Sequence, residues 1–347
     1  MSFYPSREDV ERVERVKETV KREVEKCLKD IDYGLVFAGS TALGTYVKGE
    51  YDVDVFIVSR QKDEAFSRVS KCIVGAVKKG ELDIWHTSIE GVDVDIVFLD
   101  PEHPKTQTLK HTEHYSKILN DELRREIIKA KALMKGRGCY GAELGGITGI
   151  ALTELVSKHG SLDEACRTLL KDKGIHLSDP TNPKRNLLAS VTPVRWRCIE
   201  DACREYLETG VIPSEKYTEE TFKREMEGKG FKTMQLERKD DRAVDYARAM
   251  SACVRCGNEL KNIEKDVEYE CNAYVESGTT VAYKITPEEL TPTRKVKIPL
   301  TLPEKAIEEF RKHHPDAKEV NGYLEAEVPR KIVKPREWME KCVTSRF

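Results

Sequence analysis

Long runs of apolar residues are missing from this sequence. Although 39% of its 347 residues are hydrophobic, no window approaches the length needed to cross a bilayer, which argues against a membrane-spanning protein. The amino terminus lacks the apolar core of a signal peptide, so we expect a cytoplasmic protein that does not engage a membrane. Internal repeats and low-complexity tracts are also absent, and the length suits two or three globular domains.

A strong excess of positive charge is absent too. The 59 basic and 61 acidic side chains leave a net charge of −2, which argues against a protein that coats nucleic acid through bulk positive charge. A polymerase remains compatible with this balance, because its carboxylates gather at a metal site and its basic residues along a groove. Two basic runs near the carboxy terminus, at 294–297 and 330–336, are candidates for RNA contact or for an ordinary solvated face.

Ten cysteines in a chain of this length do not indicate a disulfide framework, and we expect most of them to be reduced core residues. Cys253 and Cys256 form a C-x-x-C pair followed by Gly257, with Cys271 further along the chain. A structural zinc site usually has four ligands, and no second pair or nearby histidine is visible. Packed cysteines or a local disulfide are therefore favoured over zinc.

The pattern of apolar residues up to about residue 105 predicts a small mixed α/β unit. Valines at helical spacing predict a helix over 6–31, and a short strand at 35–37 ends at Gly39-Ser40, before a glycine-bearing loop. The remaining elements expected here are a strand at 53–58, a helix at 64–79, and strands near 83–89 and 92–99 joined by a hairpin-like turn at Glu90-Gly91.

Beyond this unit the pattern becomes helical and then mixed again. Residues 119–210 read as helices with a loop at Pro180, Asn182 and Pro183, and 211–214 is the best candidate linker. The rest of the chain is expected to be α+β, with helices at 219–229 and 303–314 and strands near 281–283 and 323–325.

Three aspartates carry the chemistry that this pattern predicts. Asp52 and Asp54 alternate with apolar residues on one strand, so both point to the same face, and Asp95 lies on a later strand that can bring a third carboxylate there. Clustered carboxylates repel one another unless a cation lies between them, and Mg²⁺ prefers such oxygen ligands. Two Mg²⁺ ions can activate a 3′ hydroxyl and stabilise the leaving pyrophosphate, while Gly39 and Ser40 offer donors to a triphosphate.

These residues resemble the nucleotidyltransferase superfamily, whose pattern is Gly-Ser, a spacer, Asp-x-Asp and a later Asp. The likeness extends to archaeal class I CCA-adding enzymes, which build the 3′ CCA of tRNA from CTP and ATP without a nucleic-acid template. It rests on three further segments and covers most of residues 1–210, becoming loose near 302–338. Those segments are Cys139-Tyr140-Gly141-Ala142-Glu143, Gly146-Ile147-Thr148-Gly149 and the run from Asp179 to Asn186.

The resemblance implies roles for individual residues. Asp52, Asp54 and Asp95 match the family's catalytic, metal-binding carboxylates, although the family often has Glu at the position of Asp52. The residues that match its nucleotide-binding positions are Gly39, Ser40, Thr108, His111, Lys131, Tyr140 and Arg185. His114 is an alternative to His111, and plain surface or core roles remain open for Lys131, Tyr140 and Arg185.

The sequence also departs from the family pattern. Gln107 stands where the family usually has an arginine before its Thr-x-x-His pair, and Gly145 replaces another arginine. Ile147 and Thr148 replace the aromatic residue and the serine of a Gly-aromatic-Ser-Gly motif. These changes concern positions expected to bind tRNA and to select the nucleotide, and they do not involve the three carboxylates.

Together these observations predict an α+β protein with three parts: a mixed α/β nucleotidyltransferase palm at 1–118, a helical central domain at 119–213, and an α+β carboxy-terminal RNA-binding region at 214–347. The expected cofactor is Mg²⁺, as two ions, and the expected partners are the tRNA 3′ end with its acceptor stem, CTP and ATP. A homodimer is left open. The alternatives are a related transferase that makes oligo(A) or another product, and a non-catalytic RNA-binding relative.

Overall fold

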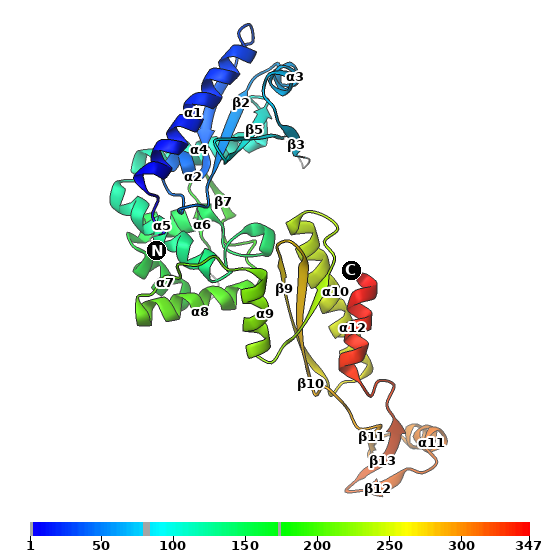
Figure 1. Ribbon diagram of the computed structural model, residues 1–347. Coiled ribbons are helices and arrows are strands. Elements are labelled where there is room, and N and C mark those ends of the chain that lie inside the picture. Colours follow the sequence, from blue (N-terminus) through cyan, green and yellow to red (C-terminus); the bar gives the residue numbers. More distant parts are fainter. Residues whose placement is uncertain (1–2, 79–83, 173–174) are drawn as a thin grey trace. The chain divides into compact units, whose positions relative to one another are not determined.

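The structure is a computed structural model that describes residues 3–78, 84–172 and 175–347, apart from the side chains of residues 105, 107 and 108. Contacts within the chain divide it into two compact units, Met1–Tyr217 and Thr218–Phe347 (Figure 1). The expected α+β class is confirmed, and the finer boundaries at 118 and 213 stay predictions. Among the described residues no helix is long and apolar enough to cross a membrane.

A five-stranded mixed sheet forms the beginning of the first unit. The strand order is β1-β2-β5-β4-β3, and β2 pairs with β5 in parallel while every other pair is antiparallel. The strands are β1 (Gly34–Ala38), β2 (Asp52–Val58), β3 (Ala76–Lys78), β4 (Ile84–Ile89) and β5 (Val92–Leu99).

The two faces of this sheet are used differently. Helices α1 (Arg7–Cys27) and α3 (Lys62–Cys72) cover one face, where the α1 valines at 13, 16, 20 and 24 meet the odd-numbered β2 valines 53 and 55 in one core (Figure 1). On the other face, apolar residues at the carboxyl ends of the strands pack with Leu109 of α4 (Gln107–Ile118). The amino-terminal halves of β2 and β5 present aspartates on that second face.

Two local predictions in this region need correction. The expected helix at 64–79 ends at Cys72, and Ala76–Lys78 is strand β3. The expected glycine-bearing loop after β1 is a five-residue helix, α2 (Gly39–Leu43), because Gly44 has a left-handed backbone (φ 67°) that lets the turn close on the Ser40 carbonyl. The β4–β5 turn at Glu90-Gly91 is confirmed, while residue 83 of the expected strand lies outside the described residues.

The rest of the first unit is helical, as expected, and its helices pack around a large apolar core. Its helices are α5 (Asp121–Gly136), α6 (Gly149–His159), α7 (Leu162–Lys171) and α8 (Pro193–Thr209), with short 3₁₀ turns at Pro104–Thr106 and Ala142–Leu144. The predicted loop at 180–183 is instead the turn and first part of a two-stranded hairpin, β6 (Ser178–Asp179) and β7 (Asn182–Asn186).

The second unit contains two three-stranded antiparallel sheets. The first has the order β8-β10-β9 and packs with α9 (Glu219–Gly228), α10 (Arg242–Ile263) and α12 (Pro335–Arg346); its strands are β8 (Lys232–Leu236), β9 (Glu268–Val275) and β10 (Thr279–Thr286). The second has the order β11-β13-β12, with β11 (Thr293–Pro299), α11 (Glu304–His313), β12 (Lys318–Val320) and β13 (Tyr323–Pro329). The helices and strands expected in this part of the sequence are confirmed.

The expectation of mostly reduced cysteines is wrong. Six of the ten form disulfides: Cys139–Cys198, Cys253–Cys271 and Cys256–Cys342. Cys253 and Cys256 lie one turn apart on α10, so both face the packed interior, where one meets β9 and the other meets α12. The four free thiols are those of Cys27, Cys72, Cys166 and Cys203.

Thiol counting tests this assignment. Alkylation of the denatured chain without reductant should label the four free cysteines, and alkylation after reduction should label all ten. Peptide mass spectrometry of the non-reduced digest should recover the three cross-linked pairs. Labelling of most cysteines without reductant would contradict the disulfides and restore the expectation from the sequence.

Candidate active site

Aspartates from two adjacent parallel strands meet on one face of the sheet. In the register of β2 and β5, Asp52 lies opposite Asp93 and Asp54 lies opposite Asp95. Because side chains alternate along a strand, these four carboxylates share a face, while the intervening residues Val53, Val55, Val94 and Ile96 are fully buried on the other. Residues 41 positions apart in the sequence thus become direct neighbours.

Gly39 closes one side of this carboxylate face. Its backbone is left-handed, with φ 71°, and a Cβ built on it would lie 2.2 Å from Oδ2 of Asp54. Only glycine allows the chain to pass this close to the aspartate. The next turn, α2, is held by Thr41, whose hydroxyl donates to the Asp52 carbonyl at 3.0 Å, and Ser40 is half-buried beside it.

Strand β4 adds a histidine that the sequence analysis did not identify. His86 pairs with Asp95 in the β4–β5 ladder, and its Nδ1 lies 2.7 Å from Oδ1 of Asp95. Its Nε2 is 3.9 Å from Oδ1 of Asp93. The sequence contains the information that places His86 and Asp93 on this face, because a two-residue turn at Glu90-Gly91 fixes which positions of the hairpin lie opposite each other.

The donor set on this face suits a hard divalent cation, because it consists of carboxylate oxygens whose charges repel one another. Among the described residues, no three His, Cys, Asp or Glu side chains are gathered closely enough to hold a metal ion. Shared ligation by Asp52, Asp54 and Asp95 would therefore require side-chain rotation. The backbone register already places the three carboxylates on neighbouring positions.

Lys131 approaches the site from α5. It is 5% exposed, and its ammonium group donates to the carbonyl and the hydroxyl of Thr45 at 2.9 and 3.0 Å. Burial and, to a smaller extent, the charge of nearby Lys135 lower the pKa of Lys131 to about 7, and the negative charge of Asp52 opposes the shift. Asp52 is therefore an electrostatic neighbour of this lysine.

Tyr140 lies beside Lys131. A Cβ added at Gly149, where α6 begins, would lie 2.6 Å from the Tyr140 hydroxyl and 3.5 Å from Cε of Lys131. The last glycine of the 146–149 motif thus leaves room for both side chains. Burial raises the pKa of Tyr140 to about 12, and the charges of Glu143 and Asp52 contribute.

His111 and Arg185 meet at a buried aspartate. Nε2 of His111 lies 2.8 Å from Oδ1 of Asp179, Thr181 donates to the same oxygen, and Arg185 is 3.5 Å from Oδ2. Burial raises the pKa of Asp179, but the hydrogen bonds from His111 and Thr181 outweigh it and hold the pKa below its ordinary value. The Arg185 side chain stays 54% exposed, so its donors can reach a ligand.

The structure therefore arranges the predicted residues in two groups. The carboxylates, Lys131 and Tyr140 interact around Asp52, and His111 and Arg185 interact around Asp179. Thr108 lies one turn before His111 on α4, but its side chain is outside the described part of the chain. His111 is buried whereas His114 contacts Tyr115, which favours His111 over His114 for the Asp179 group.

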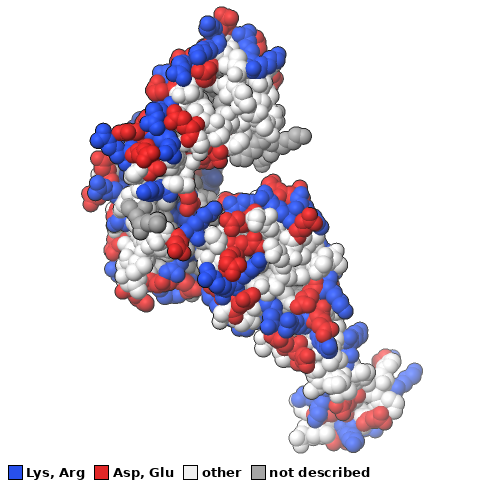
Figure 2. Space-filling model, in the orientation of Figure 1, with Lys and Arg blue, Asp and Glu red and all other residues white. Residues whose placement is uncertain are grey.

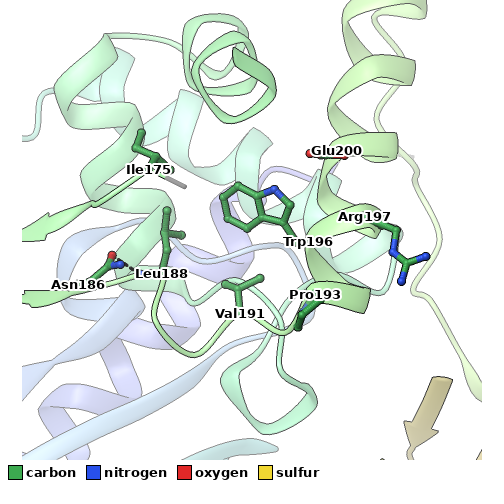
Figure 3. A pocket seen from close by; sticks show the side chains of 8 residues that line it. All are labelled: Ile175, Asn186, Leu188, Val191, Pro193, Trp196, Arg197 and Glu200. Atoms are coloured by element: carbon green, nitrogen blue, oxygen red, sulfur yellow. Dashed lines mark hydrogen bonds between the residues drawn. The ribbon is translucent and has the colours of Figure 1, made fainter. Parts of the chain in front are cut away.

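A separate cavity of about 450 Å³ lies beside the β7 strand that carries Arg185 (Figure 3). The Trp196 indole and aliphatic side chains form its walls, and Glu200 and Arg197 lie at one side (Figure 3). Its lining includes none of the catalytic or nucleotide-binding residues predicted from the sequence. Its lining residues are Ile175, Asn186, Leu188, Val191, Pro193, Trp196, Arg197 and Glu200.

The two basic runs of the second unit are partly neutralised. Arg330, 8% exposed, lies 2.9 Å from the buried Glu264, and Arg294 lies 3.6 Å from the same carboxylate. Lys295 and Lys297 face Glu327 and Glu325 across the β11–β13 ladder. On the face shown in Figure 2, basic and acidic side chains are intermingled.

Replacing Gly39 tests the close approach to Asp54. Gly39→Ala should lower the free energy of unfolding by about 1–3 kcal/mol more than Gly49→Ala, as measured by urea denaturation. Gly49 is the matched control, because it has the same φ of 71° and no atom within 4 Å of an added Cβ. Adding Asp54→Ala to Gly39→Ala should recover part of the loss, whereas equal losses in the two glycine variants would contradict the contact.

The pKa of Lys131 predicts a pH dependence of stability. Because the folded pKa is depressed, the unfolded chain binds more protons between about pH 7 and the ordinary lysine pKa, so stability should rise with pH there. Relative to Lys131→Met, wild-type protein should gain on the order of 3 kcal/mol between about pH 7 and pH 9.5. If the free energy of unfolding, measured by urea denaturation, changes equally in the two proteins between these pH values, the lysine is not buried in its neutral form.

Comparisons with known proteins agree with this geometry. Residues 13–127 match the nucleotidyltransferase domain family. Curated CCA-adding enzymes of Aeropyrum pernix, Archaeoglobus fulgidus and Saccharolobus islandicus are 26%, 25% and 27% identical over 58%, 59% and 62% of this chain, and over 54%, 53% and 60% of their own lengths.

The chain thus spans about half the length of the first two of these relatives. The solved structure of a cytoplasmic RNA terminal U-transferase is 12% identical over 59% of this chain and 89% of its own, with a TM-score of 0.48. The resemblance predicted from the sequence is confirmed: residues 13–127 match the nucleotidyltransferase domain family, and the chain is similar to archaeal CCA-adding enzymes.

Proposed function

We propose that this protein adds nucleotides to the 3′ end of RNA without a template, and that its substrate is tRNA, to which it adds C, C and A from CTP and ATP with release of pyrophosphate. The observation that carries the proposal is the β2–β5 register, which sets Asp54 beside Asp95 and next to a glycine. The similarity to archaeal CCA-adding enzymes supports the choice of substrate.

In this proposal Asp52, Asp54 and Asp95 hold two Mg²⁺ ions. Bound Mg²⁺ would lower the pKa of the 3′ hydroxyl and neutralise charge on the departing pyrophosphate. The protein would supply a fixed face for the ions, since the opposite side of both strands lies in the core. Asp54 is central, because Gly39 on one side and Asp95 on the other limit its position.

The nucleotide would be held by the surrounding residues. Gly39, Ser40, Thr108, His111, Lys131 and Tyr140 would bind the triphosphate and the sugar, and Arg185 would offer its fork of donors to the base. A polyphosphate beside Lys131 would raise its pKa and restore its positive charge, because an opposite charge favours the protonated form. The lysine would thus gain its full charge only when substrate arrives.

The RNA partner would be the acceptor end of tRNA, recognised by shape and backbone through the second unit. The balanced charges of that unit limit purely electrostatic binding, so exposed lysines would act singly on phosphates. Such an activity belongs in the cytoplasm and needs no membrane. The proposal does not include a homodimer, because nothing in the comparisons supports one.

An incorporation assay tests the substrate. The full chain would be incubated with Mg²⁺, labelled CTP or ATP, and tRNA ending before, within or after CCA. Ordered addition of C, C and A that stops at the mature end is the expected result. Repeated addition of one nucleotide would favour an oligo(A)-type transferase instead, and no incorporation together with tRNA binding would favour a non-catalytic relative.

The metal assignment predicts the effect of losing one carboxylate. Asp54→Ala should reduce incorporation by more than about 10³-fold, because the metal ions supply several kcal/mol of transition-state stabilisation. Asp30→Ala is the control, since this aspartate is 88% exposed and lies in the turn that follows α1. The circular dichroism spectrum should be the same for both variants, and activity retained by Asp54→Ala would overturn the assignment.

A further inference from the structure

His86 is the one basic side chain that the β4–β5 ladder places on the carboxylate face within hydrogen-bonding distance of an aspartate, among the described residues. Its Nδ1 lies 2.7 Å from Oδ1 of Asp95, whose side chain is only 14% exposed. The two residues are direct ladder partners, so the backbone of both strands fixes the approach. This bond is therefore built into the sheet.

Repulsion from the neighbouring carboxylates makes this hydrogen bond important for the orientation of Asp95. Asp95 has Asp54 beside it on β2, and Asp93 lies two residues earlier on its own strand. Like charges at this spacing push a free carboxylate toward solvent. A donor that holds one oxygen fixes the torsion of the carboxylate, as hydrogen bonds to ligating carboxylates do at metal sites.

Nitrogen ligation by His86 itself fits the chemistry less well, since Mg²⁺ prefers oxygen ligands. The same contact would also be made by a cross-strand side-chain pair that only stabilises the sheet, and such pairs contribute roughly 0.2–1 kcal/mol to stability. The two readings differ in what they predict for metal binding. A cross-strand pair affects folding alone, whereas a residue that orients Asp95 affects the affinity of the carboxylate face for a cation.

We propose that His86 is a positioning residue for Asp95: its Nδ1–H holds Oδ1 and so fixes the orientation in which the Asp95 carboxylate meets a divalent cation. This inference rests on the proposed function, because it assumes that Asp95 is a ligand. It assigns no direct contact between His86 and substrate. The Nδ1 proton is the essential feature, and an asparagine at this position can place an amide N–H at a similar point.

The test is Mn²⁺ binding by the full chain, measured by electron paramagnetic resonance without nucleotide or RNA. His86→Ala should weaken Mn²⁺ binding about 10- to 100-fold, and His86→Asn should restore most of the affinity. Ser88→Ala is the matched control, because Ser88 is exposed on the same strand, two residues away, and faces Asp93. In the incorporation assay, His86→Ala should lower kcat and leave the KM for nucleotide nearly unchanged.

The outcomes separate this inference from the proposed function. Mn²⁺ affinity that falls in Asp95→Asn but not in His86→Ala would overturn the positioning role alone. Equal losses in His86→Ala and His86→Asn would also overturn it, because the donor would then not matter, as would a lower melting temperature with unchanged affinity. Mn²⁺ binding that is unaffected by Asp95→Asn would overturn both the metal assignment and the role of His86.

Discussion

The parallel pairing of β2 with β5 is the constraint on which the rest of the site depends. Because side chains alternate, a slip of one residue would turn the valines of β2 toward solvent and its aspartates into the core. The α1 valines therefore fix the register through the buried face, and the carboxylate face follows from it. A hydrophobic contact on one side of the sheet thus sets the geometry of charges on the other.

Side chains from distant helices hold the short turn that borders this face. Lys17 of α1 donates to the Thr41 carbonyl, Arg124 of α5 donates to the Leu43 carbonyl, and Lys131 donates to Thr45. Each of these side chains donates a hydrogen bond to a carbonyl in or just after α2, which is too short to satisfy its own last carbonyls. The helical part of the first unit consequently supports the backbone around Gly39.

The sequence predicted the carboxylate face because alternation within a strand is a local property, readable from Asp52-Val53-Asp54 alone. It did not reveal His86, whose relation to Asp95 depends on strand pairing, although the Glu90-Gly91 turn contained that register. A local disulfide at Cys253 was left open by the sequence, but the two disulfides that join more distant cysteines were not predicted. Cys256 and Cys342 are 86 residues apart, and only the packing of α12 on α10 brings them together.

That last cross-link has a topological consequence. It encloses the whole excursion from β11 to β13 in a covalent ring, which in the chain-entropy model removes about 4–5 kcal/mol of loop-closure entropy from the unfolded chain. The small sheet can therefore fray, or be nicked by a protease, while α12 remains tied to α10. Cleavage of a peptide bond in this sheet gives two polypeptide fragments that the Cys256–Cys342 disulfide still joins covalently.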